Sequence, residues 1–380
     1  MPENFHIDMP EAVRNIIHTI EEHGFKAYAV GGCIRDSILG RNPDDWDITT
    51  SAVPSQIKTF FKRTVDTGIA HGTVTIMIDK TGYEVTTYRI DGEYEDGRHP
   101  KSVEFSDRLV DDLCRRDFTI NAMAYNDTDG FVDEFKGLDD LDAKIIRCVG
   151  EPELRFTEDA LRMMRAIRFS AQLGFTIDEA TWNAIKKLSP SISKISMERV
   201  HVELGKTLMS AHPDYVAQYS EAGLFAPILP VIDNALKSRY KRKILATLQH
   251  TPDNIYLRYA ALFITSTPDE AAKTLRALKL DNKTVDTVSK LVELSKMDIE
   301  ETEPAVRTAL NKYGRDFLPL WHELMMAVIQ ASEDITGISN PAKVKHLLTL
   351  KRLATDILAR GDCFTTVSYT HLTLPTICSV

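Results

Sequence analysis

Segments rich in β-branched and aromatic residues stop near residue 150, and this change constrains the fold more than any other feature of the chain. Thr73–Asp79 and Tyr83–Ile90 have the composition of strands, and the intervening Lys80–Gly82 is typical of a hairpin turn. After residue 150 helical periodicity dominates, and prolines separate the apolar stretches. We therefore predict an α+β domain with a small mixed sheet, followed by an elongated all-α region.

The N-terminal part alternates helical and extended segments. The pattern predicts helices over Pro10–His23, over residues 33–39 and from Pro54 onward, and strands over Phe25–Val30 and Trp46–Thr50. A double glycine, Gly31-Gly32, separates the first strand from the second helix. The order strand, glycine turn, helix exposes backbone N–H groups that can bind a phosphate.

Composition limits the class of protein. The chain has 380 residues, 43% of them hydrophobic, which suits two to four domains, and its net charge is −9. A nucleic-acid partner would therefore have to bind local basic stretches. The five cysteines show neither CxxC nor zinc spacing, and no apolar run has the length of a membrane span. We expect a cytoplasmic protein without a membrane partner.

Two aspartates follow the glycine turn in the sequence Asn42-Pro43-Asp44-Asp45-Trp46-Asp47. On a strand, residues i and i+2 point to the same face, so Asp45 and Asp47 can converge on one metal ion. Carboxylate oxygens suit Mg²⁺. Such triplets are also common on solvated loops, and it is the preceding glycine turn, with Arg35 as an added cation, that favours a site for a metal-bound phosphate.

A third carboxylate is expected on a neighbouring strand. Glu84, in the segment Tyr83–Thr87, is the candidate, although an exposed strand glutamate without a function explains it equally well. The combination resembles the polymerase-beta-like nucleotidyltransferase superfamily. That resemblance implies two-metal phosphoryl transfer with Mg²⁺ as cofactor and the ions roughly 3.5–4 Å apart.

Two further segments narrow the resemblance. They are Arg115–Ala122 (RRDFTINA) and Arg155–Phe169 (RFTEDALRMMRAIRF). Together with the glycine turn and the aspartates, they resemble class II tRNA nucleotidyltransferases, in order over about residues 25–175. The resemblance implies addition of CCA to the tRNA 3′ end from CTP and ATP. It also implies nucleotide binding by the following residues: Gly32, Arg35, Arg116, Asp159, Arg162, Arg165 and Arg168, with Glu158 orienting Arg162.

The residue types fit a base-selecting role. We expect Asp159 and Arg162 to be neighbours on one helix face, because they are separated by three positions. Asp only accepts hydrogen bonds and Arg only donates them. Cytosine and adenine each present an amino donor beside a ring-nitrogen acceptor and match this pair, whereas uracil and guanine do not. Taken without the other motifs, the segment would be an amphipathic helix with a solvated arginine stripe.

The densest basic run is Lys237–Lys243. Its cations are Lys237, Arg239, Lys241, Arg242 and Lys243, with Tyr240 interleaved. This composition favours contact with an RNA backbone, although a solvated helix face is the alternative. Lys343, Lys345, Lys351 and Arg352 form a more diffuse second stretch.

The expected domains are a catalytic head (1–137), a helical neck (138–205), a body (206–290), a tail (291–364) and a terminal segment (365–380). We interpret that last segment as foreign to the native chain, because its sixteen residues contain only His371 as a group able to carry charge. A genuine β-prone tail is the alternative. The polar segment Asp91–Pro100 matches the flexible loop of the family's head and argues against CC-only addition.

Several related functions remain open at this point. A-only-adding enzymes and bacterial poly(A) polymerases share the same head. A small-molecule nucleotidyltransferase would need no arginine-rich neck, and a non-catalytic RNA-binding module would not need Asp45 and Asp47. The sequence leaves the oligomeric state open, a homodimer included.

Overall fold

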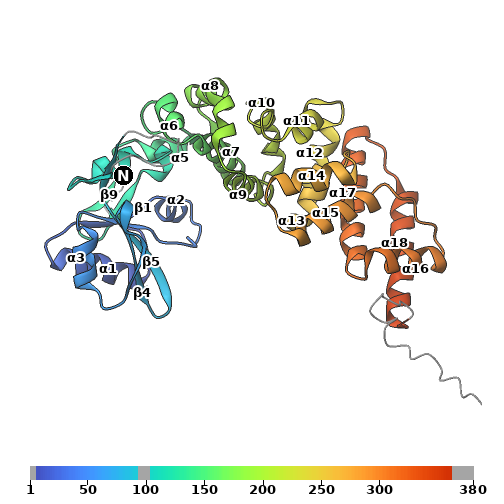
Figure 1. The fold of residues 1–380 in the computed structure, drawn as a ribbon, viewed down its shortest axis with the longest axis horizontal. Helices are drawn as coiled ribbons and strands as arrows, with labels where there is room; N and C mark the ends of the chain where they lie inside the picture. Colours follow the sequence, from blue (N-terminus) through green and yellow to red (C-terminus); the bar gives the residue numbers. More distant parts are fainter. Residues whose placement is uncertain (1–5, 93–102, 362–380) are drawn as a thin grey trace, which may run out of the picture. The chain divides into compact units, whose positions relative to one another are not determined.

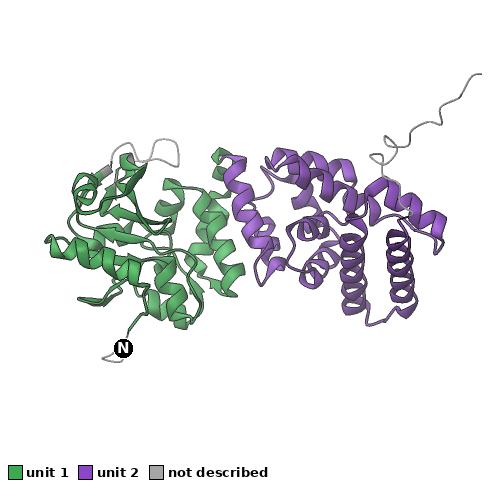
Figure 2. Cartoon of the chain, turned by 90° about the horizontal axis from the view of Figure 1, so that it is seen from below, with its two compact units in different colours: residues 1–195 green, residues 196–380 purple. Residues whose placement is uncertain are grey.

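The computed structural model describes residues 6–92 and 103–361. These residues form two compact units, divided between Ile195 and Ser196 (Figures 1 and 2). The first unit contains all seven strands of the main sheet, and the second is helical. The predicted class, a mixed-sheet head followed by a helical region, is confirmed.

The main sheet has the strand order β3-β4-β5-β2-β1-β8-β9. All neighbours pair antiparallel except β2 and β5, which are parallel. In chain order the strands are β1 (Ala27–Val30), β2 (Ile48–Thr50), β3 (Thr64–Gly68), β4 (Thr73–Ile78), β5 (Thr81–Thr87), β8 (Ala124–Asn126) and β9 (Gly130–Val132). A separate hairpin pairs β6 (Arg89–Asp91) with β7 (Val103–Phe105).

Residues on β1 alternate between the two faces of the sheet. On one face, α1 (Glu11–Glu22) contacts β1 and buries the apolar side chains Val13, Ile16, Ile17 and Ile20. On the other, Tyr28 and Val30 pack in a buried cluster with Leu113 of α4 (Leu109–Cys114). Register places Thr49 opposite Tyr28, so Asp47, two residues earlier, faces the α4 side as well.

The hairpin between β4 and β5 is tighter than predicted. Asp79 and Lys80 form a two-residue turn with φ of 47° and 71°, and Thr81 and Gly82 already pair within β5. Positive φ at both turn positions matches the twist of the flanking strands, which is why short hairpins adopt it. The predicted three-residue turn was therefore wrong by its last two residues.

The remainder of the first unit is mostly helical. It contains α2 (Gly32–Ile38), α3 (Pro54–Phe60), α5 (Gly137–Asp142), α6 (Pro152–Glu158), α7 (Leu161–Leu173) and α8 (Glu179–Leu188), with 3-10 turns η1 (Ile69–His71), η2 (Thr119–Asn121) and η3 (Ser189–Lys194). Two short strands, β10 (Ile145–Ile146) and β11 (Thr176–Ile177), pair in parallel. The second pairing strand lies beyond residue 150, where only helices were expected.

The second unit is built from helices joined by short turns. They are α9 (Met197–Leu208), η4 (Pro213–Val216), α10 (Ala217–Glu221), α11 (Pro230–Lys237), α12 (Lys241–His250), α13 (Ile255–Leu262), α14 (Pro268–Ala277), α15 (Asn282–Leu294), α16 (Glu303–Tyr313), α17 (Phe317–Thr336) and α18 (Pro341–Ala359). Prolines occupy the first turn of α11, α14, α16 and α18, where a missing N–H costs nothing. Within the described ranges, no helix has the length and apolarity needed to cross a membrane.

Candidate nucleotide site in the first unit

The glycine turn after β1 has a conformation and a neighbour that both exclude a side chain. Gly31 has φ of +86°, and a Cβ atom built there would lie 2.8 Å from Nη1 of Arg116. α2 begins at the next residue, Gly32. The Arg116 guanidinium therefore lies directly against the backbone of Gly31, in the turn that the sequence predicts to bind a phosphate.

Arg116 is positioned by a buried carboxylate that sequence reasoning missed. Asp112 in α4 has no exposed side-chain surface and accepts from Arg116 Nη2 at 3.2 Å and from Arg115 Nη2 at 2.6 Å. Burial opposes ionisation, yet the two guanidinium groups hold the pKa of Asp112 below its usual value. Nε of Arg116 is buried and has no hydrogen-bond partner among the described residues.

Asp45 and Asp47 lie immediately before β2 rather than inside it, which corrects the predicted strand Trp46–Thr50. The main chain at Asp47 is nevertheless held in register with β1, because its carbonyl accepts from the N–H of Val30 at 3.0 Å. Both aspartates are exposed residues. Loss of solvation at the carboxyl raises the pKa of Asp47, Arg116 opposes that rise, and the charge of Asp45 adds to it.

This arrangement fits a divalent cation. The pKa of Asp47 is raised mainly by loss of solvation, and the like charge of Asp45 adds to the rise; a bound cation would favour the ionised form of both carboxylates. Oxygen donors on an exposed turn are the ligands that Mg²⁺ accepts. The pair is thus chemically suited to a metal-bound triphosphate, with Arg116 beside it.

Glu84 is exposed on β5 and pairs with Thr75 of β4. In the parallel pair Ile48 lies opposite Val85, so continuing the register by one residue brings Glu84 beside Asp47. Across residues 6–92 and 103–361, however, no three His, Cys, Asp or Glu side chains are grouped closely enough to hold a metal ion. The structure therefore places Glu84 on the adjacent strand without gathering it into a ligand cluster.

Arg35 differs from the expectation that its charge faces a phosphate. Its side chain is 10% exposed and makes a two-point contact with Asp36, at 3.0 and 2.8 Å. Nη1 donates to Asn121 at 2.6 Å. Since Arg35 is already neutralised by Asp36, a contribution to nucleotide binding would have to be indirect, by fixing α2 against η2.

Asp117 connects the RRDFTIN segment to α7. It accepts from Nε of Arg165 at 2.7 Å and from the side-chain amide of Asn121 at 3.1 Å. Burial disfavours the charged form, but Arg165 and the other donors outweigh it, so the pKa of Asp117 lies well below its ordinary value. Asp117 thereby fixes both Arg165 and, through Asn121, Arg35.

The segment around Asp159 is not one continuous helix. α6 ends at Glu158, Asp159 has extended backbone with φ of −144°, and α7 starts at Leu161. The Asp159 carboxylate accepts from the N–H of Leu161 at 3.0 Å, and its carbonyl accepts from the N–H of Arg162 at 3.0 Å. The predicted placement of Asp159 and Arg162 on one helix face was wrong, although the break keeps them in local contact.

Glu158 makes the contact expected with Arg162. It accepts from Arg162 Nη1 at 2.6 Å and pairs with Arg155 at 2.6 Å, while Nη2 of Arg162 donates to the Arg115 carbonyl at 2.9 Å. The side chain of Arg162 is 12% exposed. Its Nη1 also donates to the Arg155 carbonyl at 3.3 Å, so Glu158 and two main-chain carbonyls define its orientation.

Arg168 and Arg165 flank Phe169 on α7. The Arg168 guanidinium carbon lies 3.9 Å from the ring centroid, and those of Arg165 and Arg35 lie 5.3 and 5.1 Å away. Arg168 also donates to Gln172 at 2.9 Å and is buried. Four of the predicted nucleotide ligands, Arg35, Arg162, Arg165 and Arg168, are thus held in packed positions in the first unit.

The basic run lies in the second unit, at the end of α11 and the start of α12. Lys237 pairs with Asp233 at 2.9 Å and Lys241 with Glu221 at 2.7 Å. Arg239 stacks on Tyr240. Arg242 and Lys243 are exposed, and the structure shows no ion pair for either within residues 6–92 and 103–361.

Two predicted features cannot be placed. The expected loop Asp91–Pro100 lies outside the described residues from position 93 onward, and so does the terminal segment 365–380. Three cysteines, Cys33, Cys114 and Cys148, are described and are free thiols.

Two segments of the chain match known families. Residues 27–147 match the family described as the poly A polymerase head domain. Residues 174–236 match the one described as a probable RNA and SrmB-binding site of polymerase A. The matches define the class as a nucleotidyltransferase head joined to an RNA-binding helical region.

Relatives that match over most of the chain define the family more narrowly. A CCA-adding enzyme of Streptococcus suis is 38% identical over 359 residues, covering 92% of this chain and 84% of that protein. One from Pediococcus pentosaceus is 40% identical and covers 78% and 74%. The chain belongs to the family of CCA-adding enzymes.

A solved structure gives the same result. The Bacillus stearothermophilus CCA-adding enzyme, in complex with CTP, is 33% identical and has a TM-score of 0.71, covering 92% of this chain and 82% of that one. Other relatives match over a shorter stretch. The CCA-adding enzyme of Lactiplantibacillus plantarum is 53% identical over 203 residues, and this chain therefore spans 50% of the length of that protein.

Proposed function

We propose that this protein adds CCA to the 3′ end of tRNA, using CTP and ATP as donors and Mg²⁺ as cofactor. The observation that carries the proposal is the Arg116 guanidinium, which lies against the Gly31 turn and acts electrostatically on Asp47. A cation, a phosphate-binding turn and a pair of carboxylates then meet at one end of the interior strands β1 and β2. Family membership and the CTP complex of the Bacillus relative support the same reaction.

Asp45 and Asp47 would hold the metal. Bound Mg²⁺ would supply charge stabilisation of the triphosphate and activation of the attacking hydroxyl. In the reaction, the 3′-oxygen of the RNA forms a bond to the α-phosphorus and loses its proton to solvent. The bond from that phosphorus to the bridging oxygen breaks, and pyrophosphate leaves with the electron pair.

Arg116 binds the charge of the triphosphate in this scheme, and Gly31 and Gly32 let the phosphates approach the main chain. Asp112 acts as a positioning residue, because it fixes Arg116 without facing the nucleotide. Glu84 is retained as a third carboxylate on the basis of its register beside Asp47.

Base selection is assigned to Asp159 and Arg162. Glu158 and the Arg115 carbonyl fix the guanidinium plane of Arg162, so a base that mismatches it cannot be accommodated by rotation of the side chain. An unmet buried polar group costs about 1–3 kcal/mol, and a mismatched base would leave two. Arg165 and Arg168 line the same helix and are proposed as further nucleotide contacts.

The RNA is proposed to contact the second unit at Lys237, Arg239, Lys241, Arg242 and Lys243. The exposed Arg242 and Lys243 are the strongest candidates, because the other two lysines already have acidic partners. The division into head, neck, body and tail is retained as a proposal within the two compact units. We place the reaction in the cytoplasm, in keeping with the three free thiols.

Primer choice separates this proposal from its closest alternatives. Purified protein is given tRNA lacking CCA, tRNA ending in CC, or an unstructured RNA, with each NTP singly and with CTP and ATP together. The expected products are CCA on the first substrate and a single A on the second. Addition of A alone to the CC end would indicate an A-only enzyme, long A tracts a poly(A) polymerase, and no product a binding module.

A further inference from the structure

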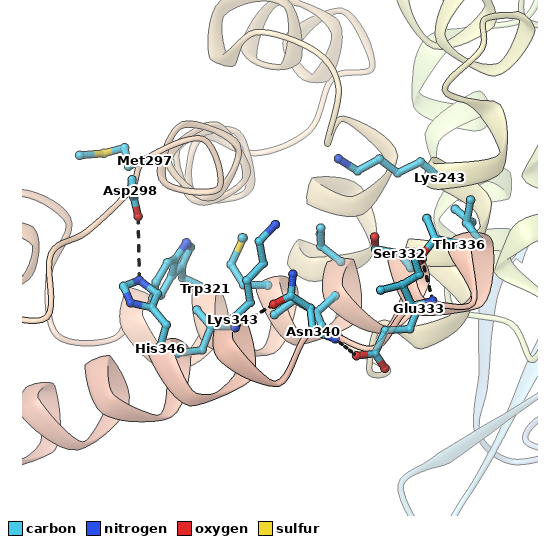
Figure 3. Close-up of a pocket in the computed structure, with 16 residues that line it drawn as sticks. Lys243, Met297, Asp298, Trp321, Ser332, Glu333, Thr336, Asn340, Lys343 and His346 are labelled. Atoms are coloured by element: carbon cyan, nitrogen blue, oxygen red, sulfur yellow. Dashed lines mark hydrogen bonds and ion pairs between the residues drawn. The ribbon is translucent and has the colours of Figure 1, made fainter.

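Charged side chains from distant segments come together in each unit. In the second unit, a pocket of about 530 Å³ lies among α12, α17 and α18 (Figure 3). Lysines and carboxylates both line it, namely Lys243, Lys343, Asp298 and Glu333, so its charge selects neither an anion nor a cation. In the first unit, two arginines converge on the C-terminal end of α4, directly before Arg116. That second arrangement bears on how the base is chosen.

The last carbonyls of α4 accept hydrogen bonds from arginines some forty positions further along the chain. Nη1 of Arg155 donates to the carbonyl of Cys114 at 3.2 Å, and Nη2 of Arg162 donates to that of Arg115 at 2.9 Å. Carbonyls in the final turn of a helix have no acceptor role inside it, so they are available to such donors. The residue that follows them is Arg116, which the proposed function assigns to the triphosphate.

Arg155 and Arg162 also share one carboxylate. Oε1 of Glu158 pairs with Nη2 of Arg155, and its Oε2 pairs with Nη1 of Arg162, each at 2.6 Å. The two arginine side chains are 12% exposed and that of Glu158 is 14% exposed, so water competes little with these contacts. The carbonyl of Arg155 accepts from Nη1 of Arg162 as well. Arg155 therefore fixes the carboxylate that orients Arg162 and contacts Arg162 through its main chain.

These contacts connect the two halves of the nucleotide site. The triphosphate is assigned to Arg116 and the base to Arg162, and both are attached to the short segment Cys114–Arg116. Arg155 is the side chain of α6 that contacts this segment and Glu158 at the same time. Its planar guanidinium can serve both acceptors in one fixed geometry, which the single ammonium group of a lysine cannot do.

We propose that Arg155 is a positioning residue for base selection, acting through Glu158 and the end of α4. It fixes the guanidinium of Arg162 relative to Arg116, so that a base that mismatches Arg162 is not accommodated by a shift of α6 against α4. The inference rests on the proposed function, because base choice is a property of nucleotide addition.

The test measures base choice in the variant Arg155→Gln. Single-turnover incorporation of CTP and of UTP is followed with the whole protein on tRNA lacking CCA. The ratio of UTP to CTP incorporation should rise about fivefold, because Arg162 loses a fixed partner. Inhibition by inorganic tripolyphosphate, which occupies only the phosphate half, should stay unchanged, since Asp112 still holds Arg116. A merely structural role would instead lower CTP and UTP incorporation by the same factor, and that result would overturn the proposal.

A double-mutant cycle tests whether Arg155 acts through Glu158. Glu158→Gln alone should also raise the ratio, and adding Arg155→Gln to it should change the ratio by no more than about twofold. Arg155→Lys keeps a cation beside Glu158, which protects the fold, and should raise the ratio less than Arg155→Gln does. Two effects that multiply independently in the cycle would overturn the proposed route.

Lys187→Gln is the matched control. Lys187 pairs with Glu153 of α6 at 2.7 Å, but both side chains are more than half exposed, and the ratio should not change in this variant. An unchanged ratio in Arg155→Gln, with a wild-type protein that selects C and A, would overturn this proposal and leave the proposed function intact. A wild-type protein that adds U as readily as C would contradict the proposed function itself, and this proposal with it.

Discussion

The cations of the first unit and those of the second are held in different ways. In the first, arginines pair with carboxylates that are themselves buried or nearly so, such as Arg116 with Asp112 and Arg165 with Asp117. In the second, Arg242 and Lys243 project from the start of α12 into solvent. Fixed, desolvated charges recognise one geometry, whereas exposed charges attract any phosphate backbone.

The difference suggests a division of roles. The first unit would decide which nucleotide is used, and the second would contribute affinity for RNA with little sequence preference. Substitutions in the first unit should therefore change rate or base choice sharply. Those in the second should change binding gradually and in a salt-dependent way.

The largest effect is expected at the paired aspartates. Asp47→Asn removes a charge but little volume, and we expect nucleotide incorporation to fall about a thousandfold or more, because metal-bound triphosphate is no longer stabilised. Asp44→Asn, three positions away and equally exposed, is the control and should retain activity. Turnover of the Asp47 variant within a few-fold of wild type would refute the metal assignment.

Base choice is expected to respond next. Asp159→Ala removes the acceptor that would face the amino group of cytosine or adenine. UTP incorporation relative to CTP should rise about tenfold or more, from the loss of one mismatched contact of about 1–3 kcal/mol. Single-turnover assays with each NTP measure the ratio. Strict preference for C and A in the variant would show that base selection lies elsewhere.

Asp117 links stability to pH in the first unit. Because its pKa is lowered in the folded state, its ionised form stabilises the fold above about pH 4, and that contribution is lost as pH falls further. Asp117→Asn should cost about 2 kcal/mol or more at neutral pH, since it removes the carboxylate partner of Arg165.

Thermal unfolding from pH 7 to pH 3 checks this expectation. The difference in free energy of unfolding between wild type and Asp117→Asn should shrink as the pH falls. Asp142→Asn changes an exposed carboxylate in α5 and should show no such difference. If the difference in free energy of unfolding between wild type and Asp117→Asn stayed constant with pH, the ion pair of Asp117 with Arg165 would not be its cause.

A smaller effect is expected from the exposed cations. Arg242→Gln and Lys243→Gln should each reduce the salt dependence of tRNA binding, lowering the slope of log K against log salt by about 0.8. Lys283→Gln, an exposed lysine on α15 outside the run, provides the comparison. Loss of base selectivity in either variant would contradict the proposed division between the units.

The smallest effect concerns two buried tyrosines of the second unit. The Tyr259 hydroxyl is buried without a hydrogen-bond partner among the described residues, whereas that of Tyr219 lies 2.7 Å from the Thr207 hydroxyl. Tyr259→Phe should be neutral or stabilising, and Tyr219→Phe should cost about 1 kcal/mol. Denaturant unfolding measures the free energy of unfolding of both variants. An equal loss of stability in the two variants would contradict this prediction.

Much of the fold could be predicted from local patterns. The period of Val13, Ile16, Ile17 and Ile20 marks α1, and β-branched residues mark β4 and β5. The break at Asp159 could also have been recognised, because an aspartate side chain favours a turn by accepting from the N–H two residues later, as Asp159 does from Leu161. The motif Arg155–Phe169 was instead predicted to be one continuous helix, whereas α6 and α7 are separate.

The supporting contacts were harder to predict. Asp112 precedes Arg115 and Arg116 by three and four positions, so its pairing with them was accessible from helical spacing. Asp117 and Arg165 are 48 positions apart, and only the packing of α7 against the head brings them together. The same applies to Arg35, whose neutralisation depends on Asn121 as well as on its neighbour Asp36.

A crystal structure with CTP and Mg²⁺ bound would test the central claim most directly. We expect the triphosphate between Arg116 and the carboxylates of Asp45 and Asp47, and the cytosine edge within hydrogen-bond distance of Asp159 and Arg162. Phosphates bound away from the Gly31 turn, or a base with no contact to either residue, would contradict it.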